Sequence, residues 1–264
     1  MANLVIDKNR LNFLIGGNRY APATDSLYRE QSVFFVGGAL PVYETLETMF
    51  DSFCTEATAL FFLTFGSGEM FLQGEEMARQ IKKNFHVRLM AGLEMSVDVA
   101  RLERIYAAGV DNLVFPVDVS NEDHTVGLSP LLQAARTIFP RWGTAATLLL
   151  GDEAPARTKS RADELLQEGI VPLLQFSAGS ASLPEEDMAA VMEHLVSGWE
   201  RHSVPVQTYL PLINVMTPLV ATKQVGFFRG FVDRLRDRQQ LAGSDIRRHL
   251  RVQQAENSLD SAGL

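Results

Sequence analysis

Short runs of apolar residues recur along the chain and alternate with segments of helical periodicity. The runs are rich in Val, Leu and Phe, and polar residues do not alternate with them, which is typical of strands covered on both faces in a parallel sheet. They span residues 11–17, 32–38, 59–65, 87–93, 112–119, 145–151, 171–177 and 204–212. The pattern therefore predicts six to eight strand-and-helix units.

The segments between these runs carry helix signals. Residues 71–85 place Met77, Ile81 and Phe85 four residues apart, which makes one apolar stripe of a helix. Ser96 and Ser129 stand at expected N-caps, and Gly109 and Gly169 stand where expected helices end. Further helices are expected over residues 96–109, 129–139, 156–169 and 183–202.

Strand starts recur roughly every 25–35 residues between residues 59 and 204, which is the length of a βαβ unit. No linker or change of composition interrupts them. We therefore expect an α/β fold, a (β/α) barrel that is either TIM-like or a partial (β/α)6 barrel, over residues 1–224. A doubly wound open sheet is the alternative.

The C-terminal segment, residues 225–264, differs in composition. Residues 225–252 hold seven arginines against three aspartates. Phe227, Phe228, Phe231 and Leu235 share one helical face. This basic helical tail is expected either to pack on the barrel with a solvated basic face or to extend from it as a docking surface for an acidic partner.

Charge and composition exclude several classes of protein. The 264 residues carry a net charge of −8, which argues against a general nucleic-acid surface. No apolar run reaches the ~20 residues that cross a bilayer, and the first ten residues lack a hydrophobic signal core. We expect a cytoplasmic protein with neither a nucleic-acid nor a membrane partner. Cys54 is the single cysteine, so this chain alone cannot build a disulfide or a cysteine-ligated iron–sulfur cluster.

Polar residues follow the predicted strands, and in a parallel barrel ligands sit at the carboxyl ends of strands. Five carboxylates fall at such ends and could serve as acid, base or cation ligands. Nothing in their spacing shows that they meet, so no metal site is predicted. The residues at predicted strand ends include Gly66, Ser67, Gly68, Glu69, Glu94, Asp118, Asn121, His124, Gly151, Asp152 and Glu153.

Three stretches, in this order, carry a family resemblance. The first is ALFFLTFGSGE at 59–69, a buried run that ends in Gly66-Ser67-Gly68-Glu69 before a helical segment. The others are LERIYAAGVDNLVF at 102–115 and TLLLGDEAPARTKSRADELLQEGIVPLLQF at 147–176. Over residues 11–215 the chain resembles the radical S-adenosylmethionine superfamily, in its biotin synthase-like branch. The resemblance implies a (β/α)6-type barrel with a site for that ligand.

The resemblance also assigns ligand contacts residue by residue. Gly66 to Glu69 resembles the motif that holds the amino group of S-adenosylmethionine in that family. Asp118 and Asn121 match the place where the family contacts the ribose and carboxylate. Gly151 to Glu153 matches the adenine-facing turn, and Glu94 is expected on the same rim.

The chain departs from the family in the loop that defines its chemistry. The family's CxxxCxxC loop matches residues 25–45 here, and this segment contains no cysteine. Without the cluster there is no electron source for cleaving S-adenosylmethionine. The first hypothesis is an accessory or non-catalytic subunit of a cofactor-biosynthesis or maturation system. It would bind this small molecule and pair with a cluster-bearing radical S-adenosylmethionine subunit.

The alternative hypothesis is a stand-alone barrel enzyme. It would use S-adenosylmethionine without radicals, through a carboxylate that acts as acid or base. A metal-assisted lyase or aldolase that uses Glu94 and Asp118 is a further version of this alternative.

Overall fold

The computed structural model describes residues 4–16, 22–55, 58–93, 97–115, 129–151, 154–176, 178–221, 245 and 248–249. Its main feature is a seven-stranded sheet in the order β2-β3-β4-β5-β6-β7-β8. Only β2 is antiparallel to its neighbour, and the strands β3 to β8 run parallel. The strands are β2 (Leu27–Glu30), β3 (Val33–Gly37), β4 (Leu60–Phe65), β5 (Arg88–Leu93), β6 (Asn112–Phe115), β7 (Thr144–Leu150) and β8 (Val171–Phe176).

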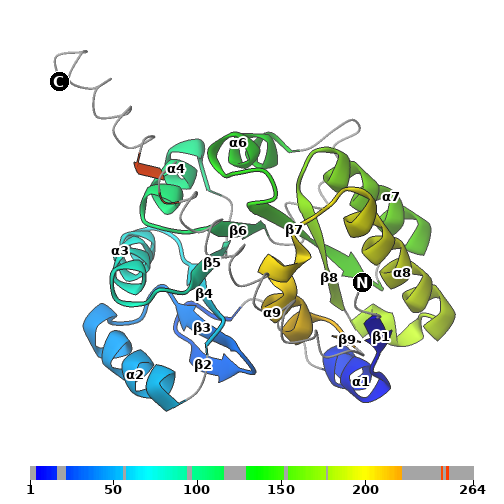
Figure 1. Cartoon of the computed structure of the whole chain (residues 1–264), viewed down its shortest axis with the longest axis horizontal. Helices are drawn as coiled ribbons and strands as arrows, with labels where there is room; N and C mark the ends of the chain where they lie inside the picture. The colour runs from blue at the N-terminus through cyan, green and yellow to red at the C-terminus, as the bar shows by residue number, and fades with distance from the viewer. Residues whose placement is uncertain are drawn as a thin grey trace, which may run out of the picture.

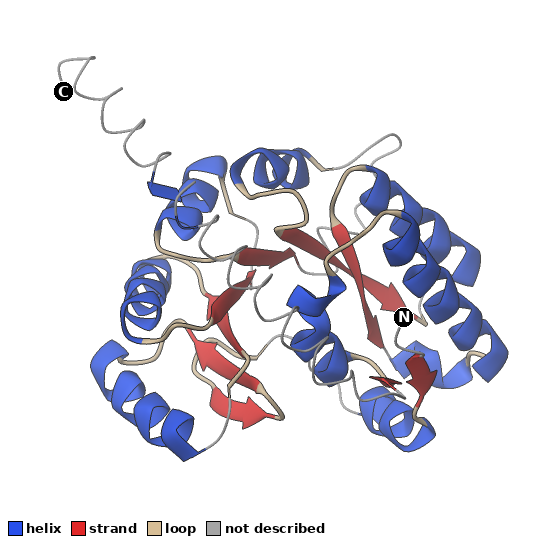
Figure 2. Ribbon diagram, viewed as in Figure 1, coloured by secondary structure: helices blue, strands red, loops and turns tan. Residues whose placement is uncertain are grey.

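The sheet curls into a half-barrel, with one set of helices on its convex side and one helix inside it (Figures 1 and 2). The outer helices are α2 (Val42–Thr55), α3 (Glu69–Asn84), α4 (Val99–Ala107), α6 (Pro130–Ile138), α7 (Pro155–Gln167) and α8 (Glu185–Arg201). Helix α9 (Val206–Met216) lies on the concave side. Near one end of the sheet lie α1 (Lys8–Gly16) and the two-stranded pair β1 (Leu4–Ile6) and β9 (Leu219–Ala221).

This architecture confirms the expected α/β fold with a mostly parallel, barrel-like sheet. Six of the predicted strands are present, as β3 to β8. Two predictions were wrong, because residues 11–17 lie mostly in α1 and residues 204–212 lie mostly in α9. Asp7 caps α1 by accepting hydrogen bonds from the amides of Asn9 (2.9 Å) and Arg10 (3.2 Å). A short apolar run alone does not distinguish a strand from a buried helix.

Ring contacts fix which side chains of β4 face the outer helices. Phe61 and Phe65 lie against Phe85 and Phe71 of the α3 region, with ring centroids 5.0 and 5.5 Å apart. Side chains alternate along a strand. The intervening Thr64 therefore belongs to the concave face.

Helix α9 fills much of the concave side, where it contacts both β3 and β8. The hydroxyl of Tyr209 accepts a hydrogen bond from Asn112 Nδ2 (3.0 Å) and donates one to the carbonyl of Trp142 (2.5 Å). Burial raises the pKa of Tyr209, so the hydroxyl keeps its proton. Arg88 donates to Asn112 Oδ1 (3.0 Å) and so continues the chain of contacts onto β5. No helix in the described ranges has the length and hydropathy to cross a bilayer.

Replacing Tyr209 by Phe removes the hydroxyl and leaves the amide of Asn112 and the carbonyl of Trp142 without this partner. We expect the free energy of unfolding to fall by about 1–3 kcal/mol, measured by urea denaturation. Tyr43, on α2, is 73% exposed, so Tyr43→Phe is the matched control and should change stability by less than about 0.5 kcal/mol. Equal stability of the two variants would contradict the anchoring role of Tyr209.

Candidate functional site

The carboxyl ends of β3 to β8 meet at one edge of the half-barrel, here called the rim. In parallel barrels, the loops that follow the strands lie at this edge, and these loops form the ligand sites. The structure describes the rim after β3, β4 and β7 and the 3-10 turn Ala178–Ser182 after β8. The predicted site residues Glu94, Asp118, Asn121, Asp152 and Glu153 lie outside the described residues, and their roles stay predictions. His124 also lies outside them.

The turn after β4 has a geometry that requires glycine. Gly68 has φ 57° and ψ −125°, and the amide of Met70 donates to the carbonyl of Ser67 (3.1 Å). These are the features of a type II′ turn with Gly68 at its second position. A Cβ placed on Gly68 would meet no heavy atom within 4 Å. The glycine is therefore needed for its backbone conformation, and the space beside it is open.

Glu69 follows directly and begins α3, a helix of 16 residues. Ser67, Gly68 and Glu69 are all exposed. The N-terminus of a helix carries partial positive charge from the helix dipole, and here the amides of Met70 and Phe71 are already bonded to the carbonyls of Ser67 and Gly68 (3.1 and 3.2 Å). The turn therefore presents the carboxylate of Glu69 and the positive end of the α3 dipole to solvent.

Gly66, in contrast, is buried beneath neighbouring side chains. A Cβ at this position would lie 3.0 Å from Met70 Cβ and 3.1 Å from Thr24 Cγ2. The Thr24 carbonyl also lies 2.1 Å from where a Cβ of Gly37 would be, so residues 22–26 pack closely on the ends of β3 and β4. The part of the predicted Gly66–Glu69 motif that a ligand can reach is Gly68 and Glu69.

Gly151 follows the end of β7 and allows the 3-10 turn after β8 to pack closely against it. Its φ is 116°, and a Cβ there would lie 2.1 Å from the amide nitrogen of Ser180. The hydroxyl of Ser180 donates to the carbonyl of Leu150, and Ser180 is fully buried. The close approach of the 3-10 turn explains why only glycine fits, while the predicted contact with an adenine ring stays a prediction.

Two further observations concern possible metal ligands and the single cysteine. No group of three or more His, Cys, Asp or Glu side chains suited to a metal ion occurs among the described residues. Cys54 is the penultimate residue of α2, which starts after β3 at the rim and ends before β4. Its backbone is therefore placed toward the opposite edge of the sheet from the Gly68 turn.

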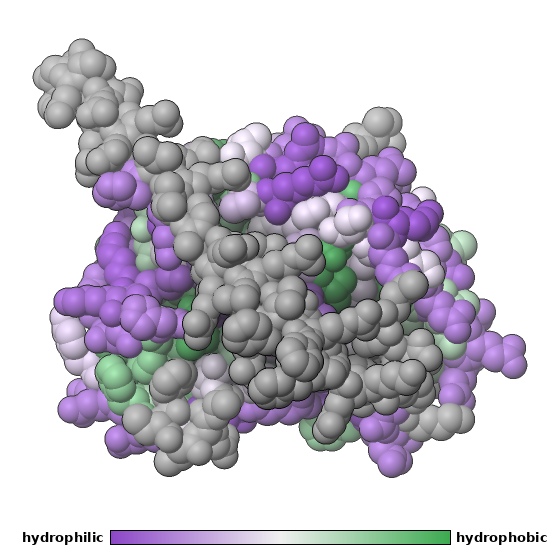
Figure 3. Space-filling view, in the orientation of Figure 1, coloured by the Kyte–Doolittle hydropathy of each residue, from purple (hydrophilic) through white to green (hydrophobic). Residues whose placement is uncertain are grey.

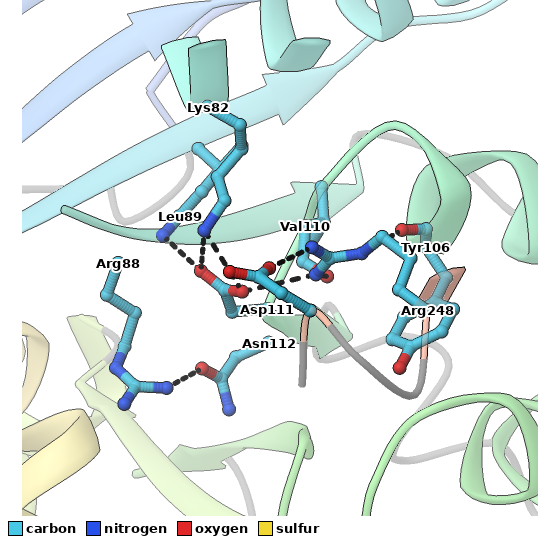
Figure 4. A network of polar contacts seen from close by, with 9 residues as sticks. Lys82, Arg88, Leu89, Tyr106, Val110, Asp111, Asn112 and Arg248 are labelled. Atoms are coloured by element: carbon cyan, nitrogen blue, oxygen red, sulfur yellow. Dashed lines mark hydrogen bonds and ion pairs between the residues drawn. The ribbon is translucent and has the colours of Figure 1, made fainter. Parts of the chain in front are cut away.

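A buried cluster of charges lies at that opposite edge, where the strands begin (Figure 4). The Asp111 carboxylate, 1% exposed, accepts hydrogen bonds from Lys82 Nζ (3.0 Å), the Leu89 amide (2.9 Å) and Arg248 Nη2 (3.1 Å). Arg248 donates in addition to the carbonyls of Tyr106 (2.8 Å) and Val110 (3.1 Å). Since the buried carboxylate is paired on several sides, we infer that the cluster stabilises the fold.

Arg248 belongs to the segment predicted to be a basic helical tail. Its contacts hold this one residue of the segment on the barrel, against the turn that joins α4 to β6. The sequence analysis missed this pairing, because 137 residues separate Arg248 from Asp111 and no local pattern links them.

A surface cavity of about 330 Å³ also lies at the edge where the strands begin. It is lined by Arg136, Arg141, Gln167, Glu168 and Gly169. Arg136 is ion-paired with Glu168, and the Arg141 guanidinium stacks 5.0 Å above the Trp142 ring. Three of the lining side chains thus already have partners, and the cavity lies at the opposite edge of the sheet from the Gly68 turn.

Comparison with known proteins adds no assignment: no protein-family model matches the chain, and no curated protein matches it significantly. The candidate site therefore rests on the geometry of the rim and on the resemblance in motif order. Within the described residues it consists of Gly68 and Glu69, with Ser67 beside them.

Replacing Gly68 by Ala tests the turn. Alanine disfavours positive φ, so we expect a loss of about 1–3 kcal/mol in the free energy of unfolding, although the added methyl group meets no neighbour. Ser67→Ala is the control at the adjacent exposed position and should cost less than about 0.5 kcal/mol. Urea denaturation of both variants measures the difference, and an undiminished stability of Gly68→Ala would show that the turn adopts another conformation.

Proposed function

We propose that this chain is a non-catalytic, ligand-binding half-barrel that holds S-adenosylmethionine at the Gly68–Glu69 turn and acts beside a second, cluster-bearing protein. One observation carries the ligand part of the proposal. The exposed type II′ turn and its carboxylate stand at the carboxyl end of β4, the second of the parallel strands. The resemblance matches the amino-binding motif to this same strand end.

The residues of the turn suit a ligand that carries both charges. The Glu69 carboxylate can accept charge-assisted hydrogen bonds from an ammonium group. The amide end of α3 favours a negative group, such as a carboxylate. An amino-acid moiety has both groups close together, and S-adenosylmethionine would supply them in a nucleoside-linked form.

The structure of the neighbouring connection supports a chain that has no cluster of its own. Strand β3 ends at Gly37 and α2 begins at Val42, so only residues 38–41 join the first parallel strand to its helix. The CxxxCxxC pattern spans eight residues, twice the length of this connection. Residues 25–45 thus lack cysteine, and the connection within them, which begins with Gly38, is too short to hold the eight-residue pattern.

Exposed apolar side chains near the rim support a protein partner. Each lies in the first turn of α2, α3 or α4, and these helices all begin at the rim. Isolated exposed apolar residues are common, but four at the starts of three adjacent helices form a candidate contact surface. Figure 3 also shows hydrophobic surface on the side of α2, whereas the side of α7 and α8 is mainly hydrophilic. The four residues are Tyr43 (73% exposed), Met70 (36%), Leu72 (55%) and Val99 (51%).

The ligand part is tested by Glu69→Gln, which keeps the shape of the side chain and removes its charge. We expect S-adenosylmethionine to bind at least about 10-fold more weakly, measured by isothermal titration calorimetry, because the ammonium loses a charged partner.

The matched control is Glu186→Gln, since Glu186 is exposed in the first turn of α8 and shares the same helix-end environment. Its affinity should equal that of the unmodified chain. Equal affinities for both variants would remove Glu69 from the site.

The partner part is tested by Leu72→Asp, which places a charge in the apolar surface beside the turn. We expect a tagged chain, recovered from its source, to bring down a protein that contains iron and acid-labile sulfide, and Leu72→Asp to lose it. Phe13→Asp, at a more exposed position on α1 (72% against 55% for Leu72), is the control and should retain the partner. Catalytic turnover by the chain alone, or a partner without iron, would contradict the proposal.

A further inference from the structure

The turn between α4 and β6 surrounds one guanidinium group with acceptors (Figure 4). Arg248 is 9% exposed, and its Nε donates to the carbonyl of Tyr106 (2.8 Å). Its Nη2 donates to the carbonyl of Val110 (3.1 Å) and to Asp111 Oδ1 (3.1 Å). The guanidinium also lies over the Tyr106 ring, 5.2 Å from the ring centroid. The turn therefore contacts both the edge and the face of the planar group, which are the two surfaces by which arginine is recognised.

The walls of this pocket are fixed by contacts that do not involve the arginine. The Leu89 amide donates to Asp111 Oδ2 (2.9 Å), and the Leu89 carbonyl accepts from the Asp111 amide (2.8 Å). The carbonyl of Tyr106 accepts from the amide of Gly109 (3.1 Å), whose φ of 111° shapes the turn. The Tyr106 ring packs edge-on against Phe139, with ring centroids 5.0 Å apart. The fold therefore forms the pocket without help from its occupant.

The acceptors in the pocket suit a guanidinium better than an ammonium group. The Asp111 carboxylate already pairs with Lys82 Nζ (3.0 Å), so its charge has one cation before the arginine is counted. Tyr106 is the penultimate residue of α4, and the C-terminal end of a helix carries partial negative charge. A guanidinium can direct its fork of N–H donors to two carbonyls and a carboxylate at once, whereas an ammonium is a compact point charge.

The occupant can leave without stranding a buried charge. When Arg248 is absent, Asp111 still has Lys82 Nζ and the Leu89 amide as donors. Asp245, whose side chain is 54% exposed, bonds to Arg248 itself (2.6 Å), so the arginine takes this partner with it. Breaking a buried ion pair is costly when it leaves a charge uncompensated, and here the carboxylate stays compensated.

We propose that the turn between α4 and β6 is a guanidinium-binding pocket that Arg248 occupies reversibly, so that the C-terminal segment of a second copy can take its place. In the structure the occupant is the chain's own segment, which reaches the pocket through Arg248. A tethered side chain competes at an effective concentration on the order of 1 mM. The inference does not depend on the ligand proposed for the Gly68–Glu69 turn, which lies at the opposite edge of the sheet.

The experiment measures binding of a fluorescent peptide, residues 243–253, to the full chain by fluorescence anisotropy. The peptide contains both Asp245 and Arg248. It should bind the Arg248→Ala chain at least about 10-fold more tightly than the unmodified chain, because only the variant lacks the competing side chain. Arg141→Ala is the matched control, since this exposed arginine stacks on Trp142 away from the pocket. Its peptide binding should equal that of the unmodified chain.

An Arg248→Lys version of the peptide tests the selectivity of the pocket. It should bind the Arg248→Ala chain at least about 10-fold more weakly than the arginine peptide does, because the ammonium cannot reach all the acceptors. If the Arg248→Ala chain does not fold, the Arg248→Lys chain replaces it, and it should also bind the arginine peptide more tightly than the unmodified chain does.

Three results would overturn the inference. The first is equal binding of the arginine peptide to the unmodified chain and to the folded variant. The second is equal binding of the arginine and lysine peptides. The third is no binding to the variant at about 1 mM peptide, the order of the effective concentration of a tethered side chain.

Discussion

A sheet that curls through only half a barrel leaves its concave face uncovered, and the fold depends on how α9 covers it. The helix contacts both β3 and β8, which are the first and the last of the parallel strands. It therefore lies where further strands would close a full barrel. Tyr209 fixes α9 to the start of β6 through Asn112 and to the start of β7 through the Trp142 carbonyl. Because these contacts hold the amino-terminal part of the interior, the rim is the region of the half-barrel that remains for a ligand.

The two edges of the sheet differ in how their polar groups are used. Where the strands begin, Asp111 draws together Lys82, the Leu89 amide and Arg248, so that a buried charge is fully compensated. At the rim, Glu69 is exposed beside an open turn. Barrels commonly place stability at the first edge and binding at the second, and the proposed function follows this division.

The sequence predicted the parts of the fold that local patterns encode. The buried runs became β3 to β8, and Ser129 and Gly109 cap helices as expected. The strand predictions for residues 11–17 and 204–212 were wrong. Either a helix or a strand can bury a short apolar run through tertiary packing, so the run alone does not decide between them. At the site, the sequence predicted the turn but not that Thr24 packs over Gly66, since that contact joins distant segments.

The central claim is that the Gly68–Glu69 turn still binds a nucleoside-linked amino acid in a chain that cannot cleave it. A crystal structure of the full chain grown with S-adenosylmethionine tests this claim most directly. The account predicts ligand density at the rim whose amino end contacts the Glu69 carboxylate. Density in the cavity near Arg136 and Arg141, or an empty rim at saturating ligand, would contradict it.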